Sequence, residues 1–162
     1  MSSPKKGLQR PHGLSRCLAR MPILLFRAHL NWLLGERFLM LTHTGRVSGL
    51  PRQTVLEVVR HDRPTDTYFV ASGWGTQSDW YRNIRKNPEV LVQVGRRRLK
   101  ATAEQLSPQE AEQELRVYVQ QHPAAARSLA RILGYTIEDP ARDFPELHHE
   151  LPIIALRPRD EN

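Results

Sequence analysis

Two glycine-containing loops carry the residues best suited to chemistry, and each follows an apolar, strand-like segment. The first loop covers residues 44–54 and presents Arg46, Ser48 and Arg52 beside its glycines. The second loop covers residues 72–83 and combines small residues with polar side chains. Exposed backbone amides beside guanidinium groups favour a phosphate or carboxylate ligand, because arginine offers a planar fork of donors. The loops therefore predict a cofactor site, and the alternative is that their glycines only satisfy turns.

Other well-known chemical motifs are missing from the sequence. It has no GxxxxGK phosphate-binding loop, no complete GxGxxG fingerprint and no GxSxG nucleophile elbow. The single cysteine, Cys17, cannot form an internal disulfide or a redox dithiol, which favours an intracellular protein. His148, His149 and Glu150 make a weak metal motif, because adjacent side chains of a regular element point apart. We therefore expect neither a metal site nor a catalytic side chain.

The net charge of +7 is distributed unevenly along the chain. No acidic residue precedes Glu36, whereas the 18 basic residues from there onward face 17 acidic ones. The nearly balanced charge of the chain from Glu36 onward argues against a nucleic-acid-binding domain. The triplet Arg96, Arg97 and Arg98 lies in an expected hairpin, where it is better explained as a solvated edge. We therefore expect no nucleic-acid partner. The alternative function from a different class is a basic nucleic-acid-binding protein.

The first 35 residues form a basic N-terminal segment that is expected to be an amphipathic helix. Its apolar stretch, residues 21–34, is shorter than the roughly 20 apolar residues that a membrane-spanning helix needs. This segment either packs on the body or contacts a membrane surface, and the sequence does not choose between the two. The expected organisation is residues 1–35 as this segment and residues 36–162 as one cofactor-binding domain. The expected location is cytoplasmic, with contact to the inner face of the membrane as the open alternative.

The remaining pattern favours a mainly antiparallel α+β domain. Strands are expected at six apolar or alternating segments, residues 37–42, 53–60, 67–72, 90–94, 97–106 and 151–156. Helices are expected at three segments, residues 78–87, 108–121 and 124–133. A capping box from Ser107 to Glu110 opens the second helix. Residues 135–150 are expected to be irregular. Strand and helix do not alternate regularly, which argues against a doubly wound sheet.

Both loops resemble the signatures of a known family. Residues 44–52, Thr-Gly-Arg-Val-Ser-Gly-Leu-Pro-Arg, resemble the TGRxSGxPR motif of the deazaflavin (F420)-dependent nitroreductases. Residues 71–75 and 79–84, followed by Asn87-Pro88-Glu89-Val90, resemble the second motif of that family. The similarity covers about residues 38–158, with both motifs in the same order. It implies a split β-barrel related to the flavin reductases, with a basic N-terminal helix and peripheral helices.

The resemblance implies the cofactor F420, a deazaflavin with a phosphate and an oligoglutamate tail. Arg46, Ser48, Arg52 and nearby amides would hold the phosphate and tail, whereas Trp80 and Asn83 would pack against and bond the cofactor. Ser72 is a candidate hydrogen-bond donor to an acceptor oxygen. The aromatic rings of Trp74 and Tyr81 are expected either to stack on the cofactor or to belong to the core. The full expected cofactor-binding set is Arg46, Ser48, Gly49, Arg52, Gln53, Thr54, Ser72, Gly73, Trp74, Gly75, Trp80, Tyr81 and Asn83.

The expected function is an F420H2-dependent reductase that passes hydride to an electron-poor conjugated small molecule, namely a quinone, an enone or a nitro compound. The chain departs from typical nitroreductases. The loop after Ser72 is shorter and contains no lysine, Asp79 precedes the tryptophan, and the tyrosine cluster that some members place over the substrate is missing. The acceptor therefore stays open, as does a homodimer. The alternative is a split-barrel protein that binds FMN, haem or a lipid without reductase activity.

Overall fold

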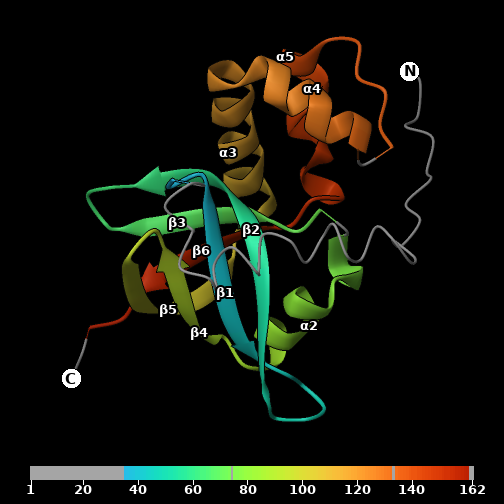
Figure 1. Cartoon of the computed structure of the whole chain (residues 1–162). Helices are drawn as coiled ribbons and strands as arrows, with labels where there is room; N and C mark the ends of the chain where they lie inside the picture. Colours follow the sequence, from blue (N-terminus) through green and yellow to red (C-terminus); the bar gives the residue numbers. More distant parts are fainter. Residues whose placement is uncertain (1–34, 74, 133, 161–162) are drawn as a thin grey trace.

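The computed structural model describes residues 35–73, 75–132 and 134–160. Within them, six antiparallel strands form a closed barrel in the order β1-β2-β3-β6-β5-β4 (Figure 1). The strands are β1 Phe38–Thr44, β2 Pro51–Asp62, β3 Thr67–Ala71, β4 Glu89–Val94, β5 Arg97–Gln105 and β6 Ile153–Pro158. This architecture confirms the predicted α+β split barrel. The expected N-terminal helix lies outside the described residues, except that Gly35 is included.

The barrel interior is one of two hydrophobic cores. Strand β1 shows how the sequence builds it, because Leu39 and Leu41 alternate with less buried neighbours and are fully buried. Val70 of β3 and Val92 of β4 complete the same cluster from other strands. The two-residue period that predicted strands in the sequence thus also decides which side chains fill the barrel.

Helix α2, Asp79–Lys86, packs against this interior near the loop that joins β1 and β2. It follows a short 3-10 turn, η2 Gly75–Gln77, and it ends where Pro88 disfavours helical backbone in the preceding residue. Trp80, Tyr81 and Ile84 are buried among the barrel side chains. The Tyr81 hydroxyl also donates a 2.7 Å hydrogen bond to Gln105 Oε1 on β5. These contacts fix the helix rigidly to the barrel.

The remaining helices cover a different face of the sheet, as the upper part of Figure 1 shows. They are α3 Pro108–Gln121, α4 Pro123–Ile132, α5 Pro140–Asp143 and the 3-10 helix η3 Pro145–His149. The capping box at Ser107 and Glu110 is confirmed. The Arg60 guanidinium on β2 binds both carboxylate oxygens of Glu114 at 2.7 Å and lies over the ring of Phe69. This bidentate pair ties α3 to the barrel.

The expectation that residues 135–150 are irregular was wrong, because α5 and η3 lie there. The Asp139 side chain accepts a hydrogen bond from the Ala141 amide, and Pro140 occupies the first helical turn. Phe144 and Leu147 are buried in the second core, under α3. The segment has caps and anchors, but each helix is too short for its periodicity to show in the sequence.

Candidate cofactor site

Of the first predicted loop, residues 44–54, only residues 45–50 form the connection between β1 and β2, because residue 44 ends β1 and residues 51–54 begin β2. Hydrogen bonds of 2.8 Å run from the Gly45 amide to the Leu50 carbonyl and from the Gly49 amide to the Gly45 carbonyl. A Cβ atom at Gly45 would lie 2.7 Å from Ser48 Oγ and 3.3 Å from the Leu50 carbonyl oxygen, so a larger residue would require the Ser48 side chain to move. Gly49 has a φ of +69°, which favours glycine. The loop geometry therefore favours glycine at both positions.

Arg46 and Asn83 join this loop to α2. The backbone amide and the Nη1 atom of Arg46 both donate 3.0 Å hydrogen bonds to Asn83 Oδ1. Lys86 donates from Nζ to the Arg46 carbonyl at 2.8 Å. Asn83 is only 4% exposed, so its amide is committed to these contacts. The structure thus ties the first loop to α2, which forms the later part of the second predicted loop, residues 72–83.

His43 is the third member of this arrangement, and the sequence analysis missed it. Its Nδ1 atom lies 3.1 Å from Asn83 Nδ2, and the residue is 5% exposed. Burial, followed by the positive charge of Arg52, lowers the pKa of His43 to about 4, while Asp79 opposes this shift. The neutral ring accepts the Asn83 amide proton at Nδ1. The alternation of Leu39, Leu41 and His43 along β1 was the available signal, since it places the imidazole on the inner face.

We expect His43 to make stability fall in acid. The folded pKa of about 4 lies below the ordinary value of 6.5, so the unfolded chain binds more protons between these values. The free energy of unfolding should therefore decline as pH drops from about 6.5 to about 4, by up to roughly 3 kcal/mol from this group. Urea unfolding at neutral and acidic pH would measure the decline. His43→Gln should remove this component, whereas His122→Gln, at an exposed position, should keep it. An equal decline in wild type and His43→Gln would contradict the assignment.

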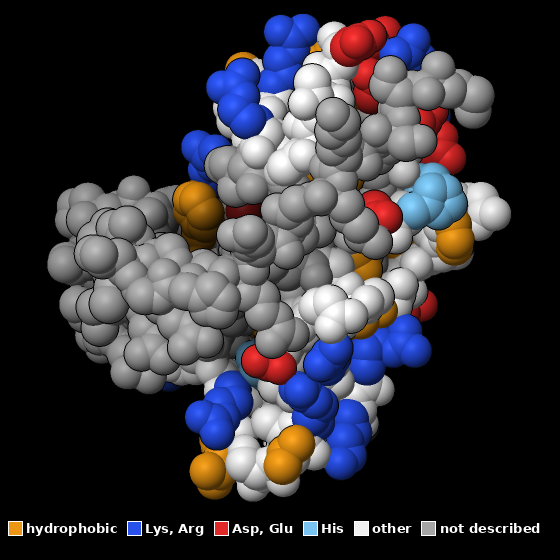
Figure 2. Space-filling model, turned by 90° about the vertical axis from the view of Figure 1, so that its right-hand side faces the viewer, with side chains coloured by type: hydrophobic (Ala, Val, Ile, Leu, Met, Phe, Trp, Pro, Cys, Tyr) orange, Lys and Arg blue, Asp and Glu red, His pale blue; other side chains and the backbone are white. Residues whose placement is uncertain are grey.

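Positive charge surrounds the first loop. Figure 2 shows Lys and Arg side chains gathered over the lower end of the molecule, around hydrophobic side chains. Arg46 forms a 3.2 Å ion pair with Asp79, the first residue of α2, so part of its charge is neutralised internally. Arg52 is exposed at the start of β2, and its guanidinium makes no hydrogen bond or ion pair with another described residue. Arg52 is consequently better placed than Arg46 to meet an anionic ligand.

The second loop is shaped by a buried serine. Ser72 is fully buried, with its Oγ atom 2.7 Å from the Gly75 carbonyl oxygen and 2.9 Å from Ser78 Oγ. Gly75 has a φ of +59°, and a Cβ atom there would lie 3.1 Å from the Glu150 carbonyl oxygen. The Ser72 hydroxyl thus has two partners inside the loop, and its position indicates a structural role that we had not expected.

The other expected site residues take different positions. The rings of Trp80 and Tyr81 belong to the barrel core, which favours the core interpretation for Tyr81. Gln53 and Thr54 are half-buried on β2, opposite β1, while Ser48 and Gly49 are exposed. Gly73 is half-buried, and Trp74 lies outside the described residues.

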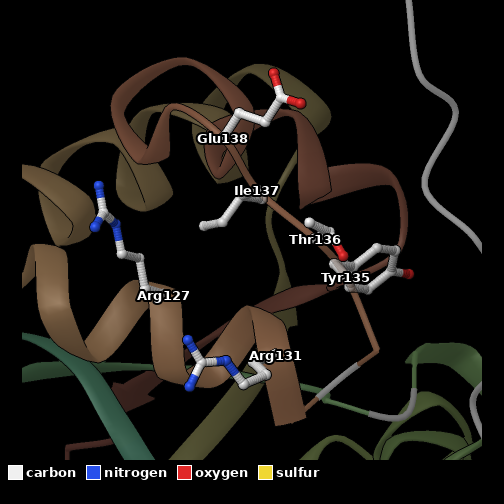
Figure 3. Close-up of a pocket in the computed structure, with 6 residues that line it drawn as sticks. All are labelled: Arg127, Arg131, Tyr135, Thr136, Ile137 and Glu138. Atoms are coloured by element: carbon white, nitrogen blue, oxygen red, sulfur yellow. The ribbon is translucent and has the colours of Figure 1, made fainter.

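A separate cavity of about 260 Å³ lies between α4 and the segment that follows it (Figure 3). Arg127 and Arg131 project from α4, and Ile137 lies between them and the side chains of Tyr135 and Thr136. None of its lining residues belongs to either glycine-containing loop. The predicted cofactor residues therefore lie apart from this cavity.

Comparisons with known proteins agree with the barrel. The model of a family described as F420H(2)-dependent quinone reductase matches residues 29–131. A solved F420-H2 dependent reductase (FDR-A) is 24% identical with a TM-score of 0.52, covering 76% of this chain and 96% of its own. No curated protein gives a match.

Two further solved structures share the fold at lower identity. An FMN binding protein related to pyridoxamine 5'-phosphate oxidase, from Nostoc punctiforme, is 16% identical with a TM-score of 0.57, covering 86% of this chain and 80% of its own. HutZ, the haem storage protein from Vibrio cholerae, is 13% identical with a TM-score of 0.52, covering 85% of this chain and 92% of its own. One barrel architecture thus occurs in proteins with different ligands.

Proposed function

The chain belongs to the F420H(2)-dependent quinone reductase family, and on that premise we propose that it reduces an electron-poor conjugated acceptor with F420H2. The observation that carries the proposal is the contact between Arg46 and Asn83, which unites both signature loops at one end of the barrel. A quinone is the favoured acceptor, in keeping with the family. An enone or a nitro compound is the alternative substrate class.

The chemistry of the donors fits the anionic part of F420. Arg52 presents an exposed guanidinium, and the Ser48 amide has no hydrogen-bond partner among the described residues. Phosphate and carboxylate oxygens accept from such donors strongly. We propose that Arg52, the amide of Ser48 and the loop around Gly49 bind the phosphate and tail. Arg46 contributes mainly by holding the loop against Asn83, since Asp79 already pairs with its guanidinium.

We propose that the protein's own residues position the cofactor and the acceptor. When bound, F420H2 supplies the hydride, so no nucleophile or metal is needed from the chain. Asn83 holds the first loop against α2 through its hydrogen bond to the Arg46 amide. Ser72 holds the turn of the second loop through its hydrogen bond to the Gly75 carbonyl. We propose that the flat ring of the cofactor lies between the two loops, beside Gly73 and Gly75. A rigid surface of this kind holds the reacting carbon against the acceptor, which lowers the entropic part of the barrier.

We also propose that residues 36–162 form the cofactor-binding domain and that two copies of the chain associate. Among the described residues, no helix combines the length and the apolarity that crossing a membrane requires. Sedimentation of the purified chain would decide the oligomeric state.

A second candidate function follows from the FMN-binding and haem-storage proteins with the same fold. In that case the barrel would bind FMN, haem or a lipid without transferring hydride. The ligands differ in tail charge, because F420 carries additional carboxylates beyond its phosphate.

Parallel binding and turnover measurements test the proposal. The purified full chain is titrated with F420, FMN and haem, and oxidation of F420H2 is then followed with the quinone menadione and with a nitroaromatic. Tighter binding of F420 than of FMN, together with quinone-dependent oxidation of F420H2, is the expected result. Binding of FMN or haem in preference to F420, without oxidation of F420H2, would establish the second candidate.

A further inference from the structure

The tip of the β1–β2 loop exposes two large apolar side chains. Val47 is 92% exposed and Leu50 is 58% exposed, the highest values among the large hydrophobic residues that the structure describes. Neither side chain is part of the barrel core. An apolar pair held in water is unfavourable unless it meets an apolar partner.

The loop holds this tip in a fixed position. Its internal hydrogen bonds at Gly45 and Gly49 close the turn, and Asn83 and Lys86 bind its backbone at Arg46. The loop projects from the lower end of the barrel in Figure 1. These bonds brace the backbone of the loop, so the apolar pair is carried on a projecting turn.

Three cations, which we call the basic collar, lie around the tip: Lys86, Arg46, whose charge Asp79 partly neutralises, and Arg52, which the proposed function assigns to the F420 tail. Lys86 reaches the loop through its 2.8 Å bond to the Arg46 carbonyl. The Cγ atom of Arg52 lies 3.6 Å from the position of a Cβ atom built on Gly45, so its stem packs along the loop. Figure 2 shows the same pattern, with hydrophobic side chains at the lower tip and Lys and Arg around them. Apolar groups that project beyond cations match the surface of an anionic bilayer.

We propose that the tip of the β1–β2 loop docks on an anionic lipid membrane. Val47 and Leu50 enter the boundary between headgroups and acyl chains. The basic collar faces the lipid phosphates, with Arg52 available to them in the cofactor-free chain. A protein partner fits less well, because two side chains on a projecting turn offer far less area than the roughly 800 Å² per partner of a stable interface. Docking would place the proposed cofactor surface beside the bilayer.

Vesicle sedimentation of the full chain without cofactor tests the proposal independently of the reductase activity. The chain is mixed with vesicles of phosphatidylcholine alone or of phosphatidylcholine with phosphatidylglycerol. We expect binding to the anionic vesicles, and about a tenfold loss of that binding in the double variant Val47→Ser with Leu50→Ser. Leu91→Ser, at the less exposed leucine on β4, serves as the matched control and should bind like wild type. Because every variant keeps residues 1–35, a contribution from that segment cancels in the comparison.

Two outcomes would overturn the proposal. One is unchanged sedimentation of the double variant with anionic vesicles, provided that its urea unfolding midpoint equals that of wild type. The other is a change from dimer to monomer in the lipid-free double variant, which would identify the tip as a contact between copies of the chain. Lys86→Gln adds a charge-specific measurement, since it should weaken binding to anionic vesicles and leave the weak binding to neutral vesicles unchanged.

Discussion

Replacing Arg52 with glutamine is expected to weaken F420 binding by about tenfold or more. Hydrogen bonds to charged groups contribute roughly 1.5–3 kcal/mol each, and about 1.4 kcal/mol corresponds to a factor of ten. Arg52 is exposed and its guanidinium makes no hydrogen bond or ion pair with another described residue, so this group is available to the ligand. The loss should appear in equilibrium titrations as a weaker dissociation constant. Because the β-barrel core does not involve Arg52, the thermal stability should change little.

A deazaflavin that lacks the phosphate and glutamates shows whether Arg52 contacts the tail or affects binding of the whole cofactor. Arg52→Gln should bind this shortened ligand as wild type does. Arg96→Gln provides the matched control, because Arg96 is an exposed arginine in the turn between β4 and β5. Equal weakening for the shortened and the complete cofactor would show that Arg52 does not contact the tail.

Asn83→Leu is expected to loosen the first loop and to destabilise the whole chain. The substitution removes the acceptor of two Arg46 hydrogen bonds and the donor that faces His43. Leaving buried polar groups unpaired costs roughly 1–3 kcal/mol for each group, so a total of about 2–4 kcal/mol is reasonable. For a chain of this size the melting temperature should drop by roughly 5–15 °C.

Hydrogen exchange separates the local effect of this substitution from the global one. The Arg46 amide donates to Asn83 Oδ1, so peptides from the first loop should exchange faster in Asn83→Leu under conditions where the barrel stays folded. Asn83→Asp retains an oxygen for Arg46 and should preserve most of the protection. Asn87→Leu, one turn later and only half-buried, is the matched control. Unchanged melting and exchange in Asn83→Leu would show that the loop does not depend on this amide.

The sequence predicted the parts of the site that depend on the backbone. Glycines at positions 45, 49 and 75 stand out because tight turns and positive φ values favour that residue type, and the structure uses each of them in this way. The capping box at Ser107 and the helix end before Pro88 were equally visible, since both are local signals. Local rules therefore located the two loops and the order of the elements.

Side-chain partners that are distant in sequence could not be predicted in the same way. His43 and Asn83 are 40 positions apart, and no rule of spacing connects a strand residue with a particular face of a later helix. The burial of Trp80 depends on which side of α2 meets the barrel, which periodicity in eight residues does not determine. The internal pairing of Arg46 with Asp79 likewise appears only once the loop and the helix lie together.

The position of β6 has a consequence for biosynthesis. This strand is the last of the six in sequence, yet it lies between β3 and β5 in the barrel. A polypeptide interrupted before Ile153 would leave both neighbouring strands with unpaired amides and carbonyls along one edge. Such edges pair readily with other chains, so truncated translation products would tend to aggregate. Only after β6 has been synthesised can the sheet close and the nascent chain escape that hazard.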